Sequence, residues 1–552
     1  MNPIESKLDT NSEEYAVNHA FMTGYLGKIR GIEQQIRNGE ERYRDRAVKA
    51  GKLLPRERLA HLLDPGTPFL ELNAIAGYKM LGDKDGTTAG GNLIMGIGFV
   101  KGRRVLVMVW NYAIKGGTIN SATMRKHLRL QQVAFQTRLP IISLSESGGG
   151  NLVDMSGEGS NSDPWGVRMF IDGGTIYCQQ AELSAAGIPQ ITVAHGNATA
   201  GGAYHVALSD YVVLVREQSH IFLAGPPLLK AATGEIAGHE ELGGAEMHAT
   251  ITGTGEYLAE NDADGIRVAR EIMDLLPPAA NRDLQRDKQP EEPLYPQEEL
   301  LGIVPTDKRI PYDMREVIAR IVDGSKFLEF KKNFGSDTIC GHAYLDGWRI
   351  GILTNDGPIS PQGANKSAQF LQLCDQTKTP MIFLHNTTGF LVGKDPEQSG
   401  QVKHGSKMVQ AVANFRPPKF TIVVGNSYGA GNYAMGSQSL KPAFSFSWPT
   451  ARTSVMGGAQ AAKVLAIVAE DRFKAKGEEP GPEVKAKLEA QSEAIEAAME
   501  VASEAIYTSA RMMDDGLIDP RDTRHVLAIC LETYFELDRR GTQPNSFGVA
   551  RF

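Results

Sequence analysis

An internal repeat limits the folds that this 552-residue chain can adopt. The segment KHLRLQQVAFQTRLPIISLSESGG at 126–149 returns 240 residues later as KSAQFLQLCDQTKTPMIFLHNTTG at 366–389. Further matched pairs follow the same order: 56–72 with 315–330, 87–111 with 337–356, and the turn GNATAGGAY at 196–204 with GNSYGAGNY at 425–433. Segments that recur in one order predict two copies of the same fold.

Each half has the pattern of a layered α/β domain. Helical patterns alternate with short β-branched runs such as ITVAH at 191–195 and FTIVVG at 420–425, which is typical of parallel strands buried between helices. Strong helix formers at 482–516 predict one long helix near the end of the chain. A stretch rich in proline and charge predicts a linker, so the expected organisation is a domain at 1–275, a linker at 276–302 and a domain at 303–552.

The composition excludes several classes of protein. The net charge of −7 and the lack of a long basic run argue against a nucleic-acid partner. No apolar stretch approaches the roughly 20 residues of a membrane helix, and the polar start is unlike a signal peptide, so we expect a cytoplasmic protein without membrane contact. The four cysteines show no CxxC spacing, and no metal site is predicted.

The repeated turns have the clearest chemical meaning. In each, a buried strand runs into small residues that open a helical pattern, Ala200-Gly201-Gly202-Ala203 in one half and Gly429-Ala430-Gly431-Asn432 in the other. Two free N–H groups at such a helix start can hold an oxyanion, an effect worth about 3–4 kcal/mol per donor. The alternative is that small residues only permit tight packing of helix on strand. Retention of both turns favours the oxyanion interpretation.

At these residues the chain resembles a known family, the carboxyltransferase (β) subunits of biotin-dependent acyl-CoA carboxylases. The likeness runs from about residue 30 to the C-terminus. The motifs that carry it include KGGT (115–118), ESGGGNL (146–152), TAGGAY (199–204), FLAGPPLLKAATGE (222–235), TGFLVG (388–393), GAGNY (429–433) and FGVARF (547–552). TAGGAY, TGFLVG and GAGNY have the form of the methylcrotonyl-CoA and geranyl-CoA carboxylases, so this branch looks closest.

The resemblance implies two tandem crotonase-like (ClpP/crotonase) domains related by duplication, the first binding acyl-CoA and the second biotin. It implies transfer of CO2 from carboxybiotin to an acyl-CoA, with γ-carboxylation of 3-methylcrotonyl-CoA as the first candidate. Alternatives are geranyl-CoA or another acyl-CoA such as propionyl-CoA, a biotin-dependent acyl-CoA decarboxylase subunit running the chemistry in reverse, and a non-catalytic scaffold of the complex.

Carried over by motif, the amides of Gly201 and Gly202 would hold the thioester enolate oxygen, and those of Ala430 and Gly431 the ureido oxygen of biotin. The resemblance also implies an acyl-CoA site at Lys115, Gly116, Gly117, Gly148, Gly149, Ala200, Ala203, Tyr204 and Lys230. Lys230 can meet a CoA phosphate or simply be solvated, and the charges of Arg125 and Lys126 make them further candidates for the CoA phosphates. The implied biotin site contains Gly389, Phe390, Gly429, Asn432 and Tyr433. No side-chain base is obvious in either turn, so catalysis would depend on position and electrostatics.

Four polar residues beside the motifs have two interpretations each. His195 and His205 flank the first turn and can act as general bases, but local hydrogen bonding is the favoured role. Glu146 and Asn386 occupy equivalent repeat positions after a buried strand, where an active-site group can project. Stabilisation of the turn is the favoured role for both.

The partners follow from motifs that the sequence lacks. It contains no AMKM-type biotinylation sequence and no glycine-rich ATP-binding pattern. We therefore expect biotin to arrive on an α subunit with biotin carboxylase and biotin carrier domains, and the resemblance implies a homo-hexamer built as a dimer of trimers.

The chain departs from the methylcrotonyl pattern at three places. His205-Val206 stands where Val-Pro is expected, ESGGGNL replaces DSGGANL, and the first part of 151–185 is unlike the branch. These positions flank the expected acyl pocket and therefore concern the acyl group more than the reaction type.

Overall fold

The computed structural model describes residues 1–151, 166–277, 285–475 and 481–550. The chain forms two compact units, each described by itself below. The N-unit comprises residues 30–284, 510–512 and 533–552, and the C-unit comprises residues 1–29, 285–509 and 513–532. The division falls within α1 (Glu13–Glu41).

The predicted boundaries placed residues 1–29 in the first domain and residues 533–552 in the second. In the structure, residues 1–29 belong to the C-unit and residues 533–552 to the N-unit. In the C-unit, the Asn18 side chain of α1 donates to the carbonyl of Gly302 at 3.2 Å. In the N-unit, the tail runs along the end of α6, where the N–H of Asn545 donates to the carbonyl of Ala185 at 2.9 Å. Of the predicted linker, residues 285–302 belong to the C-unit, and residues 278–284 lie outside the described ranges.

The N-unit is built on a sheet that is antiparallel at one edge and parallel elsewhere. Its order is β1-β2-β3-β4-β5-β6-β8, and β7 pairs with the far end of β5. The β1–β2 and β2–β3 pairs are antiparallel, and the remaining pairs are parallel. The strands are β1 (Leu70–Leu72), β2 (Leu93–Val100), β3 (Arg103–Trp110), β4 (Ile141–Ser147), β5 (Gln190–Thr199), β6 (Tyr211–Val215), β7 (His220–Phe222) and β8 (Tyr257–Ala259).

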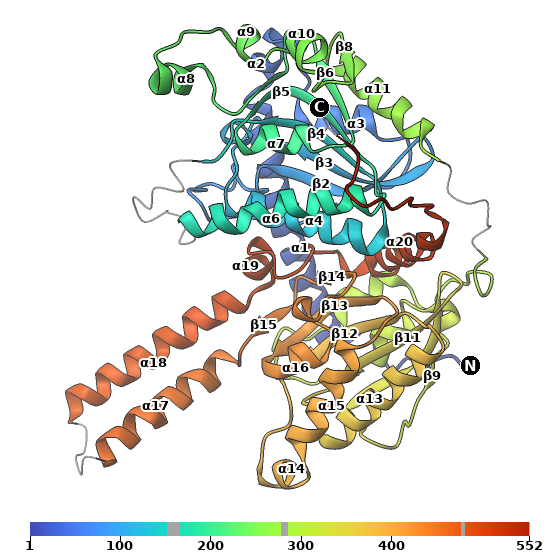
Figure 1. Ribbon diagram of the computed structural model, residues 1–552. Coiled ribbons are helices and arrows are strands. Elements are labelled where there is room, and N and C mark those ends of the chain that lie inside the picture. Colours follow the sequence, from blue (N-terminus) through green and yellow to red (C-terminus); the bar gives the residue numbers. More distant parts are fainter. Residues whose placement is uncertain (152–165, 278–284, 476–480, 551–552) are drawn as a thin grey trace. The chain divides into compact units, whose positions relative to one another are not determined.

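Helices bury both faces of this sheet, which explains its nearly continuous apolar strands. Leu59 and Leu62 of α3 and Ile266 and Ile272 of α11 pack on one face. On the other side α4 and α6 lie side by side (Figure 1). The α-helices of this half are α2 (Arg44–Lys49), α3 (Pro55–Leu62), α4 (Ser121–Thr137), α6 (Gly166–Ala185), α7 (Gly201–Ala207), α8 (Pro226–Thr233), α9 (His239–Gly243), α10 (Ala245–Met247) and α11 (Asp262–Leu275).

The C-unit repeats this strand arrangement, except that its described residues include no counterpart of β8. Its sheet has the order β14-β13-β12-β11-β10-β9, antiparallel over β9–β11 and parallel from β11 to β14, with β15 paired to the far end of β13. The strands are β9 (Leu328–Glu329), β10 (Thr338–Leu345), β11 (Trp348–Asn355), β12 (Met381–Thr387), β13 (Lys419–Tyr428), β14 (Phe444–Ser447) and β15 (Arg452–Ser454). The predicted α/β class is therefore confirmed, with one sheet in each unit.

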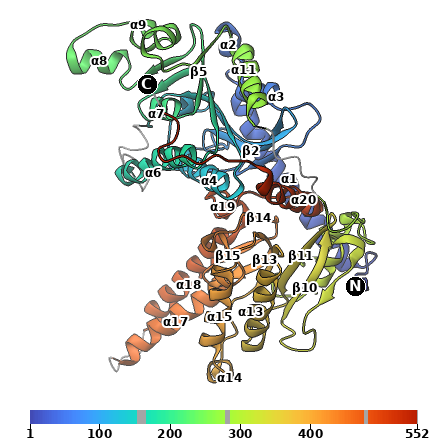
Figure 2. The same ribbon diagram turned by 45° about the vertical axis from the view of Figure 1, so that its right-hand side comes forward.

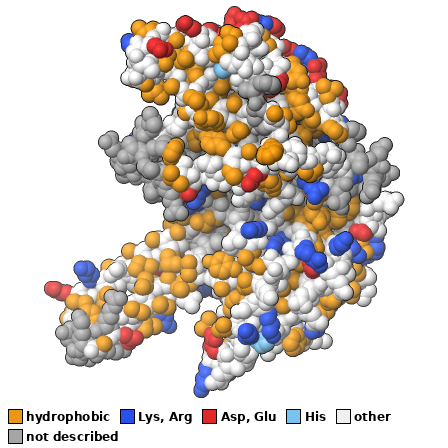
Figure 3. Space-filling view, in the orientation of Figure 1, with side chains coloured by type: hydrophobic (Ala, Val, Ile, Leu, Met, Phe, Trp, Pro, Cys, Tyr) orange, Lys and Arg blue, Asp and Glu red, His pale blue; other side chains and the backbone are white. Residues whose placement is uncertain are grey.

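Two helices, α13 and α15, cover one face of the second sheet through Phe370, Leu371, Met408 and Val412. A helical hairpin, α17 and α18, extends from this unit (Figure 2) and carries exposed apolar side chains (Figure 3), among them Leu465. The α-helices of this half are α12 (Arg315–Ala319), α13 (Pro361–Gln376), α14 (Lys394–Gln398), α15 (Gln401–Ala413), α16 (Gly429–Ala434), α17 (Gly458–Ala475), α18 (Pro482–Ser503), α19 (Ala505–Ala510) and α20 (Thr523–Phe535).

The prediction of one helix over 482–516 is wrong at its C-terminal part. The helix stops at Ser503 because Glu504 is extended, with φ −63° and ψ 145°. The Glu504 carboxylate there lies 3.3 Å from the guanidinium of Arg452 and accepts a hydrogen bond from Tyr25 at 3.2 Å. Within the described ranges, the helices include none long and apolar enough to cross a membrane.

Candidate active site

The first repeated turn joins β5 to α7 in the N-unit. β5 ends at Thr199, Ala200 turns the chain with φ 51° and ψ −114°, and α7 begins at Gly201. A positive φ is strained for alanine, so the surrounding contacts must hold this turn in place. One of them is the hydrogen bond from the Ala200 N–H to the carbonyl of Phe222, at 3.1 Å. Among the described residues, no acceptor faces the N–H groups of Gly201 and Gly202, since they open the helix.

Close neighbours explain the small residues of this turn. A Cβ at Gly202 would lie 3.3 Å from the Cβ of Ser147, and a Cβ at Gly201 would lie 2.3 Å from the Tyr177 hydroxyl. Tight packing and free N–H donors therefore occur together, and neither interpretation of the turn excludes the other. Tyr177 of α6 also contacts the ring of Tyr204, with centroids 5.9 Å apart. Nothing in the sequence pattern marked Tyr177, because its place depends on how α6 packs.

The KGGT and ESGGG segments are hydrogen-bonded to each other beside the turn. Gly116 and Gly117 have φ of 66° and 65°, a conformation that favours glycine. The N–H of Gly148 donates to the carbonyl of Gly116 at 3.0 Å, and the N–H of Gly149 donates to the Ser147 hydroxyl at 3.2 Å. The amides of Gly148 and Gly149 are therefore occupied, whereas those of Gly201 and Gly202 have no acceptor within the described residues.

The second turn reproduces the first in the C-unit. β13 ends at Tyr428, Gly429 takes a φ of 57° where the first turn has Ala200, and the N–H groups of Ala430 and Gly431 also lack an acceptor in the described part of the chain. A Cβ at Gly431 would lie 2.8 Å from the Cα of Gly389. This contact is even closer than the one behind Gly202.

Hydrogen bonds around the two turns match pairwise, 240 residues apart. The N–H of Ile119 donates to the carbonyl of Gly149 at 2.8 Å, and the N–H of Ile359 donates to the carbonyl of Gly389 at 2.8 Å. The Gly389 N–H donates to the Thr387 hydroxyl at 3.2 Å, as the Gly149 N–H does to Ser147. The repeat inferred from the sequence therefore extends to individual backbone contacts.

The side chains of the predicted biotin site divide into occupied and open groups. Asn432 donates to the Ser427 hydroxyl at 2.8 Å, so its amide is occupied. The Phe390 ring packs against Gly405 of α15 rather than standing free. Tyr433 is exposed, like its counterpart Tyr204 in the first turn.

Glu146 and Asn386 each lie at an irregularity where the parallel pairing shifts register. Bulges of this kind re-aim a side chain next to a site. The Glu146 carboxylate accepts from Lys52 at 2.6 Å and from the fully buried Arg58 at 2.8 Å, and Arg58 also contacts Asp262 at 2.9 Å. Glu146 therefore belongs to a buried ion-pair network, which the sequence could not show because its members are far apart in the chain.

Both histidines beside the first turn are buried and hydrogen-bonded. His195 contacts Asp262 at 2.7 Å, and burial together with the charge of Arg58 lowers its pKa. His205 contacts the hydroxyl of Ser143 at 2.9 Å, and burial lowers its pKa to about 4. Both imidazoles thus form local hydrogen bonds and are neutral near pH 7.

The basic candidates for the CoA phosphates are placed very differently. Lys126 is fully buried, and its amino group donates to the carbonyls of Gly90 and Leu93, so its suggested contact with a CoA phosphate is wrong. The amino group of Lys115 donates to the carbonyl of Leu81.

The remaining basic candidates lie at the surface. Lys230 is exposed on α8, in the part of the motif that forms a separate short helix. The Arg125 guanidinium is exposed and donates to the carbonyl of Arg511 at 3.4 Å. The described side chains include no group of three or more His, Cys, Asp or Glu residues arranged to hold a metal ion.

Comparison with known proteins agrees with this geometry. The carboxyl transferase domain family matches residues 46–546. The chain is 46% identical over 520 residues to the biotin-dependent 3-methylcrotonyl-coenzyme A carboxylase beta1 subunit of Mycobacterium tuberculosis, covering 93% of this chain and 94% of the relative. It is 42% identical over 538 residues to the methylcrotonoyl-CoA carboxylase beta chain of Dictyostelium discoideum, covering 96% of this chain and 88% of that one.

A solved structure gives the same result. The β subunit of geranyl-CoA carboxylase from P. aeruginosa superposes with a TM-score of 0.91 at 50% identity, covering 100% of both chains. The resemblance drawn from the motifs is thus confirmed. The chain belongs to the carboxyl transferase domain family, and within it to the carboxyltransferase β subunits of biotin-dependent acyl-CoA carboxylases.

Proposed function

We propose that this carboxyltransferase moves CO2 from carboxybiotin to the γ carbon of a 3-methyl-branched, α,β-unsaturated acyl-CoA, with 3-methylcrotonyl-CoA as the first candidate. The observation that carries the proposal is the pair of matched turns, each with two N–H groups at a helix start that have no acceptor among the described residues. Identity of 46% to a 3-methylcrotonyl-coenzyme A carboxylase β subunit supports this acyl group.

In this proposal the two units are tandem crotonase-like domains that arose by duplication. Their strand orders match except for the additional edge strand β8 of the N-unit, and this match and the equivalent bonds at Ile119 and Ile359 support a common origin. The N-unit holds the acyl-CoA and the C-unit holds biotin, as the family motifs imply. The functional domains follow the halves of the sequence at 1–275 and 303–552, although residues 1–29 belong to the C-unit and residues 533–552 to the N-unit.

The N-unit turn acts on the thioester. The N–H groups of Gly201 and Gly202 donate to the carbonyl oxygen, on which negative charge develops as the γ carbon loses its proton. Each such donor contributes about 3–4 kcal/mol to transition-state stabilisation. Neither His195 nor His205 is the base in this proposal, because both imidazoles are fully buried and bonded within the protein.

The C-unit turn fits the ureido group of biotin. A ureido oxygen is an acceptor, and the N–H groups of Ala430 and Gly431 are donors without a protein acceptor in the described part of the chain. Gly431 lies against Gly389 with no room for a side chain, so a ligand can approach the backbone closely. When bound, carboxybiotin would supply the CO2 and, once the CO2 has left, a ureido group that accepts the γ proton. The residues of this turn would hold and orient its ureido oxygen.

Geranyl-CoA is the second candidate, favoured by the 50% identity and full coverage shared with a geranyl-CoA carboxylase β subunit. Both acyl groups carry the same 3-methyl-2-enoyl end, so the chemistry at the turn is shared. His205, one of the departures from the methylcrotonyl pattern, is buried and contacts the Ser143 hydroxyl. It therefore belongs to the core beneath the turn. Much of the divergent 151–185 segment, residues 152–165, lies outside the described residues.

The partners are part of the proposal. Biotin arrives on an α subunit that carries biotin carboxylase and biotin carrier domains, and the β subunits assemble as a hexamer, a dimer of trimers, in the cytoplasm. Light scattering of the purified chain and fractionation of cells test the assembly and the location. A monomer at working concentration, or a membrane-bound pool, would contradict them.

The test of function is an ATP-dependent fixation assay with [14C]bicarbonate and a biotinylated α subunit. Methylcrotonyl-, geranyl-, propionyl- and acetyl-CoA are compared for the wild type, for Gly202→Val and for the control Gly31→Val. Gly31 is exposed on α1, and a Cβ there meets nothing within 4 Å. We expect fixation into a 3-methyl-branched substrate, lost in Gly202→Val and kept in the control. Fixation into propionyl- or acetyl-CoA alone would overturn the assignment of the acyl group. No fixation with intact assembly would favour the scaffold.

A further inference from the structure

A difference between the two repeated turns lies at Gly201. The segments GNATAGGAY and GNSYGAGNY match residue by residue, so that Gly201 of the first corresponds to Ala430 of the second. Ala430 shows that the turn itself accepts a methyl group at this position. In the N-unit the corresponding space is taken by the Tyr177 hydroxyl, which lies 2.3 Å from where a Cβ of Gly201 would be. Gly201 therefore makes room for a side-chain hydroxyl of α6.

The Tyr177 hydroxyl lies on the side of α7 toward which the N–H groups of its first residues point. The Cα–Cβ bonds of a helix tilt toward its N-terminus, and the first N–H groups point the same way. Because a Cβ lies about 2.5 Å from the nitrogen of its own residue, the hydroxyl oxygen is at most about 4.8 Å from the Gly201 nitrogen. Two donors that each lie about 2.8 Å from one oxygen can be as much as about 5.6 Å apart. A single ligand oxygen can therefore accept from both groups.

The Tyr177 hydroxyl is available as a donor. It has no hydrogen-bond partner among the residues that the structure describes. Its ring is held by contacts with Met124 of α4 and with the ring of Tyr204, whose centroid is 5.9 Å away. Burial and the neighbouring Tyr204 raise the pKa of Tyr177, so the hydroxyl keeps its proton near pH 7. A fixed, protonated hydroxyl of this kind is a preorganised donor.

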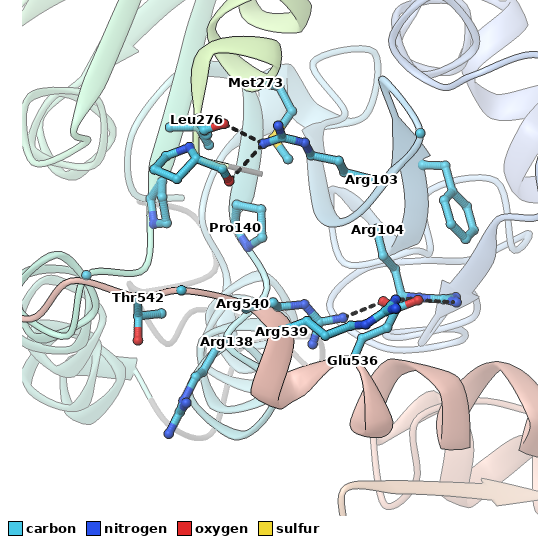
Figure 4. A pocket seen from close by; sticks show the side chains of 16 residues that line it. Arg103, Arg104, Arg138, Pro140, Met273, Leu276, Glu536, Arg539, Arg540 and Thr542 are labelled. Atoms are coloured by element: carbon cyan, nitrogen blue, oxygen red, sulfur yellow. Dashed lines mark hydrogen bonds and ion pairs between the residues drawn. The ribbon is translucent and has the colours of Figure 1, made fainter. Parts of the chain in front are cut away.

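The arginines of the pocket at the other end of the sheet are too far from the turn to stabilise charge there. In that pocket Arg104 and Arg540 contact Glu536 (Figure 4), and Pro189 lines it directly before β5. Ala200 follows the opposite, carboxyl end of β5, and the ten residues of this strand span roughly 30 Å. Charges at such a separation are screened at physiological ionic strength.

We propose that Tyr177 is a catalytic residue whose hydroxyl donates a third hydrogen bond to the thioester oxygen of the acyl-CoA as the enolate forms. This inference rests on the proposed function, which places that oxygen at the amides of Gly201 and Gly202. Tyrosine hydroxyls donate to enolate oxygens in oxyanion sites of other enzymes. The hydroxyl keeps its proton throughout, since it acts as a hydrogen-bond donor and not as the base. Gly201 thus supplies one donor through its amide and admits another through its missing side chain.

The first test compares Tyr177→Phe, which removes the hydroxyl and keeps the ring, with the wild type. Tyr257→Phe is the control, because Tyr257 is an exposed tyrosine of the edge strand β8. Steady-state fixation by the full-length protein with the biotinylated α subunit gives kcat and KM. Infrared spectra of bound acyl-CoA, labelled with 13C at the thioester carbonyl, report the hydrogen bonds to that oxygen directly. The ligand is 3-methylcrotonyl-CoA or geranyl-CoA, whichever the wild type binds more tightly.

We expect kcat to fall about 10-fold or more in Tyr177→Phe with little change in KM, because the hydrogen bond strengthens as charge develops on the oxygen. The carbonyl band should move to higher frequency in Tyr177→Phe, since a donor is lost, and should stay in place in Tyr257→Phe. A kcat within about threefold of the wild type, or an unmoved band, would overturn the proposal. The spectra need no α subunit, so failure of the wild type to fix CO2 counts against the proposed function and is distinguished from loss of this hydrogen bond.

Gly201→Ala tests the same contact without changing Tyr177. The new Cβ must displace the hydroxyl, so kcat should fall about as far as in Tyr177→Phe. In the double variant the ring carbon that carried the hydroxyl would lie 3.6 Å from this Cβ, an ordinary contact. The two losses should therefore not add, since both remove the same hydrogen bond. Fully additive losses would show that the two residues act independently and would overturn the proposal.

Discussion

The contact behind Gly431 gives the sharpest prediction about catalysis. In Gly431→Ala the new Cβ would lie 2.8 Å from the Cα of Gly389, whereas carbon atoms in contact prefer about 3.5–4.0 Å. The start of α16 must therefore move away from the end of β12 by about 1 Å, and it carries the Ala430 and Gly431 donors with it. A displacement of about 1 Å at a reacting centre can cost about 100-fold in rate. We expect kcat/KM for CO2 fixation to fall by about 100-fold in this variant.

Gly202→Ala is the matched comparison, because its Cβ would lie 3.3 Å from the Cβ of Ser147 and needs a shift of only a few tenths of an ångström. Its loss should stay below about 10-fold. Steady-state fixation with the biotinylated α subunit measures both variants, and Gly31→Ala on the exposed face of α1 controls for the added methyl. The reasoning is refuted if Gly431→Ala stays within threefold of the wild type, or if both variants lose activity equally.

Three further predictions concern stability, measured as the free energy of unfolding in denaturant. Burial lowers the pKa of Lys126 to about 7, so above that pH the folded protein binds fewer protons than the unfolded chain. The free energy of unfolding should therefore rise from pH 7 toward pH 10. The Lys126→Met variant should show a smaller rise. Arg58→Gln removes the guanidinium that pairs with the buried carboxylates of Glu146 and Asp262, so the free energy of unfolding should fall by about 3–5 kcal/mol. A fall of less than about 1 kcal/mol would contradict the importance of this ion-pair network. Ala200→Gly relieves a strain of about 1–3 kcal/mol against up to about 1 kcal/mol of added chain entropy, so stability should stay equal or increase, and a clear decrease would contradict the strain.

Much of the fold could be predicted from short-range patterns. The repeat at 126–149 and 366–389 placed a helix and a buried strand in each half, and the structure has α4 with β4 and α13 with β12 at these positions. The turns at 196–204 and 425–433 are strand-to-helix junctions, as their small residues indicated. These features depend on periodicity and on residue size, which a sequence shows directly.

Other parts of the site could not be predicted, because they join segments that are distant in the chain. Lys126 has the charge of a phosphate ligand, but the fold buries it against the carbonyls of Gly90 and Leu93. Tyr177 is an ordinary helical residue until α6 brings its hydroxyl beside Gly201.

The duplicated α/β fold, the two small-residue turns and the membership in the carboxyltransferase family could all be recognised in the sequence alone. Which polar groups are occupied depends instead on the tertiary structure. The amides of Gly148 and Gly149 and the amine of Lys126 are bonded internally, while the amides of Gly201 and Gly202 have no acceptor in the part of the chain that the structure describes. A hydrogen bond forms only where the fold brings a donor and an acceptor together in space, and the spacing of residues along the chain does not show which groups meet.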